Sequence, residues 1–89
     1  MTDVLDAAWR VPEQVAVRPE RFGALLYHFG TRRLSFLKSP ALLAVVRTLG
    51  DWPTARIACE HAGVGVEELP AFRAALTALA ASDMIRERT

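Results

Sequence analysis

The stretch FGALLYHFGTRRLSFLKSP, residues 22–40, decides how the rest of this chain can fold. Residues 24–29 are almost continuously apolar and rich in aromatic side chains, which is typical of a central β-strand. Residues 30–32 supply a short loop with a glycine, a common hairpin connection. Residues 33–38 then indicate the next strand. The stretch therefore predicts two antiparallel strands joined by a tight loop.

The alternation in the second of these strands predicts which of its side chains share a face. Leu34 and Phe36 point to one face, while Arg33, Ser35 and Leu37 point to the other, because successive side chains of a strand alternate. We expect this arrangement to leave Leu37 as an apolar side chain on the outer face.

The residues upstream predict one more strand and a terminal arm. Valines alternate with polar or small neighbours over residues 14–18, which indicates a half-buried strand that Pro19 closes. Residues 1–13 show no sustained period. We expect them to form an arm that packs through Trp9, or in part a frayed terminus.

The apolar period becomes helical after the third strand. Ser39 is a good N-cap, and Pro40 suits the first position of a helix. Thr54 predicts the cap of a short second helix. Pro70 lies in the first turn of a third helix, which runs to about Ala81. The core-facing positions expected in these helices are Leu42, Val45, Val46, Leu49, Ile57, Ala58, Ala62, Leu69, Phe72, Leu76 and Leu79.

This order of elements predicts an α+β fold with a small three-stranded antiparallel sheet followed by three helices. A three-stranded sheet buries one face, and three helices are enough to cover it. We expect residues 1–13 to be an N-terminal arm, 14–85 a single winged-helix-like domain, and 86–89 a polar tail.

Composition excludes several classes of protein. The 89 residues are 52% hydrophobic and 24% charged, with a formal net charge of +1, which describes one small domain without room for a large cleft. The single Cys59 leaves no disulfide framework and no cysteine-based zinc site. No stretch approaches the roughly 18–20 apolar residues of a membrane span. Because the start is acidic and unlike a signal peptide, we expect a cytoplasmic protein that does not bind membranes.

Residue types that carry catalysis are few. His28 stands alone in an aromatic strand, where a hydrogen-bonded structural role is the commoner one. Cys59 and His61 are two residues apart on an expected helix, so their side chains diverge and cannot share a ligand. The glycines at 63 and 65 follow a helix and lack the Lys-Ser/Thr of a phosphate loop. The sequence therefore predicts no enzyme, no metal site and no cofactor.

A small DNA-binding regulator is the alternative, because the last two helices could form a helix-turn-helix motif. The helix that would enter the DNA groove carries one basic residue, Arg73, against Glu67 and Glu68. The chain has six basic and four acidic residues through residue 40, but five and six after it. Since this charge lies on the wrong half for DNA contacts, we expect no nucleic-acid binding.

The third strand suggests recognition of a peptide by strand addition. If the strand lies at the edge of the sheet, its unpaired N–H and C=O groups can pair with an extended chain. Arg33 and Lys38 bracket it. These cations either meet a bound peptide or guard the edge against aggregation, and the residue types alone do not separate the two.

Three segments stand out when they are taken in succession: Val17-Arg18-Pro19-Glu20, Phe22-Gly23-Ala24-Leu25-Leu26-Tyr27 and Leu34-Ser35-Phe36-Leu37-Lys38-Ser39-Pro40. Together they resemble the PqqD-like peptide chaperones, also called precursor-peptide recognition elements, and within them the members that serve mycofactocin biosynthesis. The resemblance covers roughly residues 11–85. Each motif is common alone, and only their succession is distinctive.

The resemblance implies a non-catalytic chaperone that binds the leader segment of a ribosomally made precursor peptide by strand addition. It also implies delivery of that peptide to a radical S-adenosylmethionine (SAM) maturase. One departure is Asp83, because members usually have glycine where the third helix ends; Asp tolerates the left-handed conformation better than most residues. The implied peptide contacts, with the flank of the helix left open, are Arg33, Leu34, Ser35, Phe36, Leu37 and Lys38 from the third strand and Arg73, Leu76, Thr77 and Ala80 from the third helix.

Overall fold

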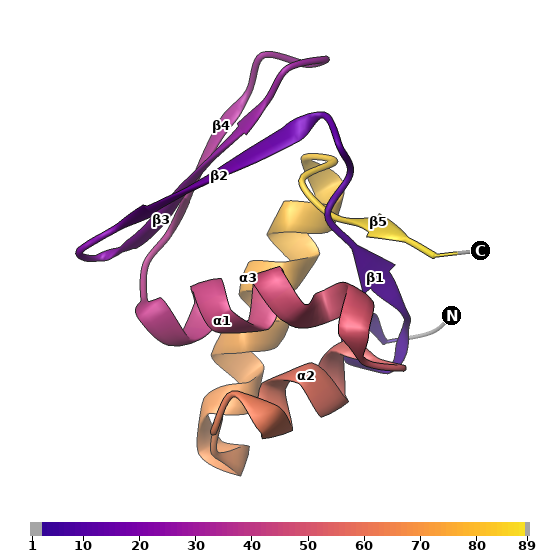
Figure 1. The fold of residues 1–89 in the computed structure, drawn as a ribbon. Coiled ribbons are helices and arrows are strands. Elements are labelled where there is room, and N and C mark those ends of the chain that lie inside the picture. Colours follow the sequence, from indigo (N-terminus) through magenta and orange to yellow (C-terminus); the bar gives the residue numbers. More distant parts are fainter. Residues whose placement is uncertain (1–2, 89) are drawn as a thin grey trace.

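A computed structural model describes residues 3–88, and Figure 1 shows how their elements are arranged. Strands β2, β3 and β4 form an antiparallel sheet, and the three α-helices lie on one side of it. The predicted α+β fold, a three-stranded sheet followed by three helices, is thereby confirmed. The elements in chain order, with η marking short 3-10 helices, are η1 (Val4–Asp6), β1 (Trp9–Arg10), β2 (Val15–Glu20), β3 (Gly23–His28), β4 (Leu34–Leu37), α1 (Pro40–Thr48), η2 (Leu49–Asp51), α2 (Ala55–His61), η3 (Val66–Glu68), α3 (Leu69–Ala81) and β5 (Arg86–Glu87).

The central strand of the sheet is β3, as its apolar composition predicts. It pairs with β2 on one side and with β4 on the other, so β2 and β4 are the two edges. Ala24, Leu26 and His28 of β3 are buried against the helices, because alternate side chains of a strand share a face. The sheet therefore contributes one apolar face to the core.

The prediction that Leu37 lies on the outer face is wrong. Leu37 is fully buried, whereas Leu34 is 56% and Phe36 61% exposed. The register explains this, because Leu37 pairs with Ala24 and shares its buried face. Alternation groups the side chains of a strand into two sets, but only pairing with a neighbour decides which set points inward.

The helix ends follow the capping chemistry of the sequence. The Ser39 hydroxyl accepts a hydrogen bond from the Leu42 N–H at 3.1 Å, and Pro40 opens α1. The Thr54 hydroxyl accepts from the Ile57 N–H at 3.3 Å and caps α2. Asp83 follows the end of α3 with a φ of 60°, in the left-handed conformation that its short polar side chain tolerates. These predicted boundaries are confirmed.

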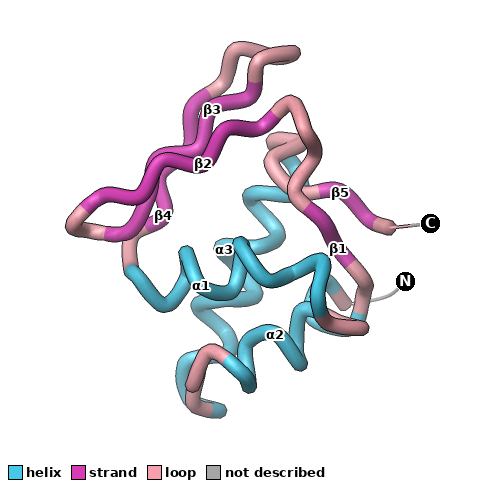
Figure 2. Tube along the Cα trace, in the orientation of Figure 1, coloured by secondary structure: helices cyan, strands magenta, loops and turns pink. Residues whose placement is uncertain are grey.

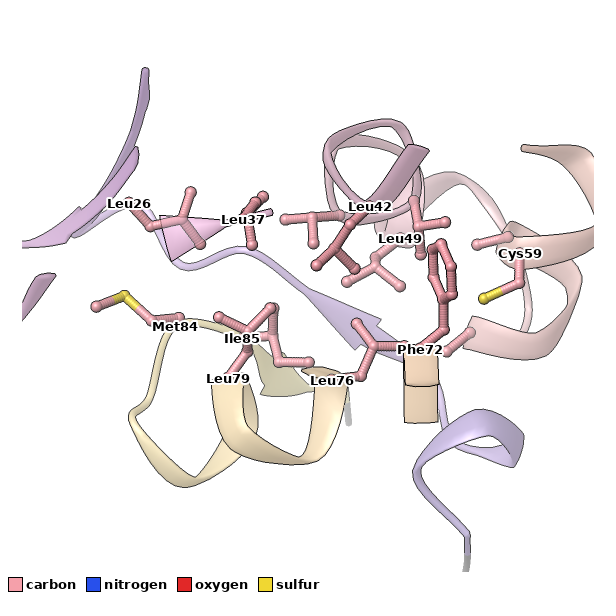
Figure 3. Packing of buried hydrophobic residues seen from close by; sticks show 14 of the residues in the cluster. Leu26, Leu37, Leu42, Leu49, Cys59, Phe72, Leu76, Leu79, Met84 and Ile85 are labelled. Carbon is pink, nitrogen blue, oxygen red and sulfur yellow. The ribbon is translucent and has the colours of Figure 1, made fainter. Parts of the chain in front are cut away.

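The core lies between the sheet and the helices. Figure 3 shows Leu26 and Leu37 of the sheet on one side, with Leu79 and Ile85 opposite them. Most helix positions expected in the core are buried, although Ile57, Ala62 and Leu69 are only half-buried. The buried cluster consists of Leu5, Val15, Ala24, Leu26, Leu37, Leu42, Val45, Val46, Leu49, Ala55, Ala58, Cys59, Phe72, Leu76, Leu79, Met84 and Ile85.

The two ends of the chain pair with each other, which the sequence pattern did not predict. Figures 1 and 2 show β1 beside β5, and Trp9 pairs with Glu87 in an antiparallel two-residue ladder. Trp9 is half-buried and donates from Nε1 to the Val4 carbonyl at 2.7 Å, so the expected anchoring role of this residue is confirmed. Leu5 is fully buried. The arm therefore joins the core through η1.

Two ion pairs tie η1 and its cap to the helices. The Asp6 carboxylate pairs with Nε of Arg56 on α2, with Oδ1 and Nε 2.8 Å apart. The Asp3 carboxylate pairs with Nε of Arg73 on α3, with Oδ2 and Nε 3.0 Å apart. The pKa of Asp3 is lowered chiefly by the Leu5 N–H, and further by Arg73. The pKa of Asp6 is lowered chiefly by its hydrogen bond with Arg56. These contacts place the arm along one flank of α3.

Candidate functional site

A groove of about 560 Å³ runs between β4 and α3. Its walls are mostly apolar, and Lys38 is the charged residue among them. This volume lies within the range of roughly 300–1,000 Å³ that is usual for ligand sites. The groove is lined by Ser35, Phe36, Leu37, Lys38, Ser39, Leu42, Ala71, Phe72, Ala74, Ala75, Ala78, Leu79 and Ser82.

The helical wall of this groove is built from small side chains. Ala71, Ala75 and Ala78 of α3 and its C-cap residue Ser82 follow one another at spacings of four, three and four, which places them on one side of the helix. Small side chains leave the space between helix and strand unfilled. The groove therefore stays open because this flank of α3, beside its buried stripe, carries alanines in place of larger side chains.

The β4 edge above the groove has free backbone groups. The His28 N–H donates to the Arg33 carbonyl at 3.0 Å, which marks Arg33 as a residue whose backbone faces β3. In an antiparallel ladder the backbone groups of alternate residues face alternate sides. The N–H and C=O groups of Leu34 and Phe36 therefore point away from the sheet, toward an added strand.

The opposite edge of the sheet is less suited to strand addition. The Phe29 N–H donates to the Gln14 carbonyl at 2.8 Å, so the same alternation directs the backbone of Val15, Val17 and Pro19 outward. Pro19 has no N–H to donate, and proline is one way in which proteins blunt an edge strand. The two edges therefore differ, and β4 is the open one.

The structure brings together only part of the site implied by the sequence. Ser35, Phe36, Leu37 and Lys38 line the groove, Leu37 from the core as its floor. Leu34 is exposed and is not among the residues that line the groove. Arg33 is exposed beside the start of β4. The strand half of the predicted site is thus contiguous along one edge.

The helix half of the implied site lies elsewhere. Leu76 is fully buried in the core, and Arg73 is paired with Asp3. Thr77 and Ala80 line a second, smaller cleft of about 310 Å³ beside the N-terminal arm. A core stripe on a helix has two flanks, and the arm covers the one that carries these residues. The residues that sequence reasoning missed, Ala71, Ala74, Ala75, Ala78 and Ser82, form the other flank, and their helical spacing was the available signal.

The residues considered for catalysis stabilise the fold: His28 accepts hydrogen bonds from a loop, and Cys59 is buried in the core. The Nδ1 atom of His28 accepts hydrogen bonds from the Gly30 and Thr31 N–H groups, at 3.0 and 3.1 Å. Cys59 is buried, and desolvation raises the pKa of its thiol. Within residues 3–88, no three His, Cys, Asp or Glu side chains are grouped to hold a metal ion. The described helices are also too short or too polar to cross a membrane.

An open strand edge beside an apolar groove is the geometry of small domains that bind an extended segment of another chain at their surface. The chain belongs to the peptide chaperone MftB family, whose family model matches residues 8–86. The resemblance seen in the sequence is confirmed at this level.

Curated relatives agree with the family assignment. The chain is 59% identical over 80 residues to the peptide chaperone MftB of Mycobacterium ulcerans, covering 90% of this chain and 73% of that one. It is 57% identical over 83 residues to the protein of the same name from Mycobacterium tuberculosis, covering 93% and 76%. No solved structure gives a significant match. A peptide chaperone is not a catalyst, so the expectation that this chain is not an enzyme is confirmed.

Proposed function

We propose that this chain binds the leader segment of a ribosomally made precursor peptide and delivers it to a radical SAM maturase in mycofactocin biosynthesis. The observation that carries the proposal is the open backbone edge of β4 directly beside the groove lined by α3. The leader adds as a fourth strand next to β4. Its alternate side chains then enter the groove, because the side chains of a strand point to opposite faces.

The proposed site keeps the strand residues inferred from the sequence and changes the helical wall. Leu34 and Phe36 offer four backbone groups to the leader, and Leu37 forms the floor. The proposed helical contacts are Ala71, Ala74, Ala75, Ala78 and Ser82 in place of Arg73, Leu76, Thr77 and Ala80.

Energetics indicate what kind of leader fits. Each backbone hydrogen bond contributes about 0.5–1.5 kcal/mol, while ordering each leader residue costs about 1–2 kcal/mol. Backbone pairing alone therefore yields little affinity. Micromolar binding needs about −8 kcal/mol, so apolar anchors at about 1.5–3 kcal/mol each must supply most of it. We expect two or three apolar leader residues, with acidic groups near Lys38 and Arg33.

The first experiment is an NMR titration of the isotope-labelled chain with the synthetic leader of the precursor peptide. The amides of Leu34 to Lys38 should shift and become protected from exchange. Shifts confined to other elements would contradict strand addition at β4.

A second experiment fills the groove. Ala78→Trp places a large side chain in the groove from an exposed position of α3, and it should weaken leader binding by about tenfold or more. Ala81→Trp is the matched control, because Ala81 is exposed on the same helix and does not line the groove. Equal affinity of the two variants for the leader would contradict the proposed helical wall.

DNA binding is less well supported. The single basic residue of α3, Arg73, is already paired with Asp3 of the same chain. A gel-shift assay should show no salt-sensitive complex with duplex DNA. A specific complex with DNA that dissociates as the salt concentration rises would favour a DNA-binding regulator instead.

A further inference from the structure

The face of the sheet that points away from the helices carries an exposed apolar surface. Two cross-strand pairs of β3 and β4 place four apolar side chains together on it. A phenylalanine at each end of β3 extends the surface, through ring centroid distances of 6.3 and 5.1 Å. The six residues are called the outer apolar face here: Phe22, Leu25, Tyr27, Phe29, Leu34 and Phe36.

The exposure of this surface is unusual for so small a domain. Among residues 3–88, five large apolar side chains are exposed, and four of them belong to the outer apolar face. Phe29 and Phe36 are each 61% exposed. No helix covers this side of the sheet in Figure 1 or Figure 2. Contiguous apolar surface of this kind marks an interaction site on a soluble domain.

Basic residues are concentrated in the segment that forms the sheet and carries the outer apolar face. Residues 16–38 contain five basic side chains and one acidic one, whereas the rest of the chain has six basic and nine acidic. Arg18 pairs with that acidic residue, Glu20, at 3.2 Å. The other four cations form no ion pair within the described part of the chain: Arg21, Arg32, Arg33 and Lys38. The sheet that carries the outer apolar face therefore has a net positive charge.

We propose that the outer apolar face docks the protein that receives the peptide, through a patch of apolar side chains rimmed by Asp and Glu on that partner. The identity of the partner as the maturase rests on the proposed function, but the chemistry of the patch does not. Aromatic residues and Arg are enriched in protein interfaces. Complementary charge speeds such encounters and selects the partner.

The charge and ring geometry disfavour other occupants. A second copy of this chain would bring two positively charged sheets together, which costs free energy. Base stacking needs open ring faces, whereas Tyr27 and Phe29 already make an edge contact at 83° and Phe22 and Phe36 are tilted at 48°. A protein partner fits these observations better than nucleic acid or a second copy.

The outer apolar face is continuous with the proposed leader site. Phe36 lies on this face and also lines the groove beside α3. A leader added next to β4 widens the sheet, and half of its side chains then lie on the same side as Leu34 and Phe36. A partner docked here would therefore contact the chaperone and the bound peptide at once.

The test compares Phe29→Glu with Val66→Glu. Phe29 is exposed at the end of β3, away from the groove, and Val66 is an 81% exposed apolar residue of η3, outside the sheet. Calorimetry measures Kd for the purified radical SAM maturase, and fluorescence anisotropy measures Kd for the leader peptide. Phe29→Glu should weaken maturase binding about tenfold or more, and Val66→Glu should leave it unchanged. Both variants should bind the leader within about twofold of the parent chain, with unchanged circular dichroism.

Three results would overturn the docking proposal. These are no binding of the parent chain to the maturase, equal maturase affinity of the two variants, or maturase binding that does not weaken as salt rises. Binding of the parent chain to phosphatidylglycerol vesicles or an RNA oligonucleotide, lost in Phe29→Glu while maturase binding persists, would assign the face to that ligand instead. Failure of the leader titration at β4 would sink the proposed function alone, since Phe29 is outside that site.

Discussion

Gly23 lies directly against the backbone of Leu37. A Cβ atom built on Gly23 would lie 2.0 Å from the Leu37 carbonyl oxygen and 2.8 Å from the Ser39 amide nitrogen. Gly23 also has a φ of +153°, a backbone conformation that residues with a Cβ atom rarely adopt. This contact fixes β4 and the start of α1 against β3, and with them one wall of the groove.

Gly23→Ala should destabilise the fold by about 3 kcal/mol or more, because backbone atoms must move to relieve the overlap. Urea unfolding measures the loss. Gly50→Ala is the control, since nothing lies within 4 Å of a Cβ there, and it should change stability by less than about 1 kcal/mol. Similar stability of the two variants would contradict the close approach.

Leu37→Ala and Leu34→Ala test which face of β4 is buried. Leu37 is fully buried, and its truncation should cost about 2–5 kcal/mol. Leu34 is 56% exposed, and its truncation should cost about 0.5 kcal/mol or less. Thermal or urea unfolding compares them. A larger loss of stability in Leu34→Ala than in Leu37→Ala would instead place Leu37 on the outer face, as expected from the sequence.

His28→Leu should destabilise the loop between β3 and β4. The N–H groups of Gly30 and Thr31 lose their acceptor in this variant. A buried donor without an acceptor costs about 1–3 kcal/mol. Because these two hydrogen bonds are only part-buried, we expect a loss of stability of about 1–2 kcal/mol. Amide exchange at both residues should speed up relative to the rest of β3. Unchanged exchange there would show that the imidazole is not their acceptor.

Acidification should loosen the N-terminal arm. The pKa values of Asp3 and Asp6 are lowered below 3.8 in the folded chain by the Leu5 N–H, Arg73 and Arg56. A carboxyl whose pKa is lowered by folding stabilises the folded chain at pH values above its unfolded pKa of about 3.9. This stabilisation is lost as the pH falls through the pKa of the folded state. The combined variant Asp3→Asn with Asp6→Asn should therefore lose less stability than the parent between about pH 5 and pH 2. Identical pH profiles would contradict this contribution.

Local chemistry predicted most of the elements. Ser39 and Thr54 cap helices, Pro40 and Pro70 lie in first turns, and Asp83 takes the left-handed conformation after α3. Each of these outcomes depends on one residue and its neighbours. The pairing of β1 with β5 depends on residues almost eighty positions apart, and two-residue strands leave no period to detect.

The sequence by itself determined the three strands and the three helices, because each follows from an apolar period or a short motif, and the succession of three segments carried the resemblance to the family. Only the tertiary structure decided the two orientations on which the site depends. The register of β4 on β3 buries Leu37 and exposes Leu34, since a period of two is symmetric between faces. The arm anchored by Asp3 on Arg73 covers one flank of α3, and so leaves the alanines of the other flank to line the groove.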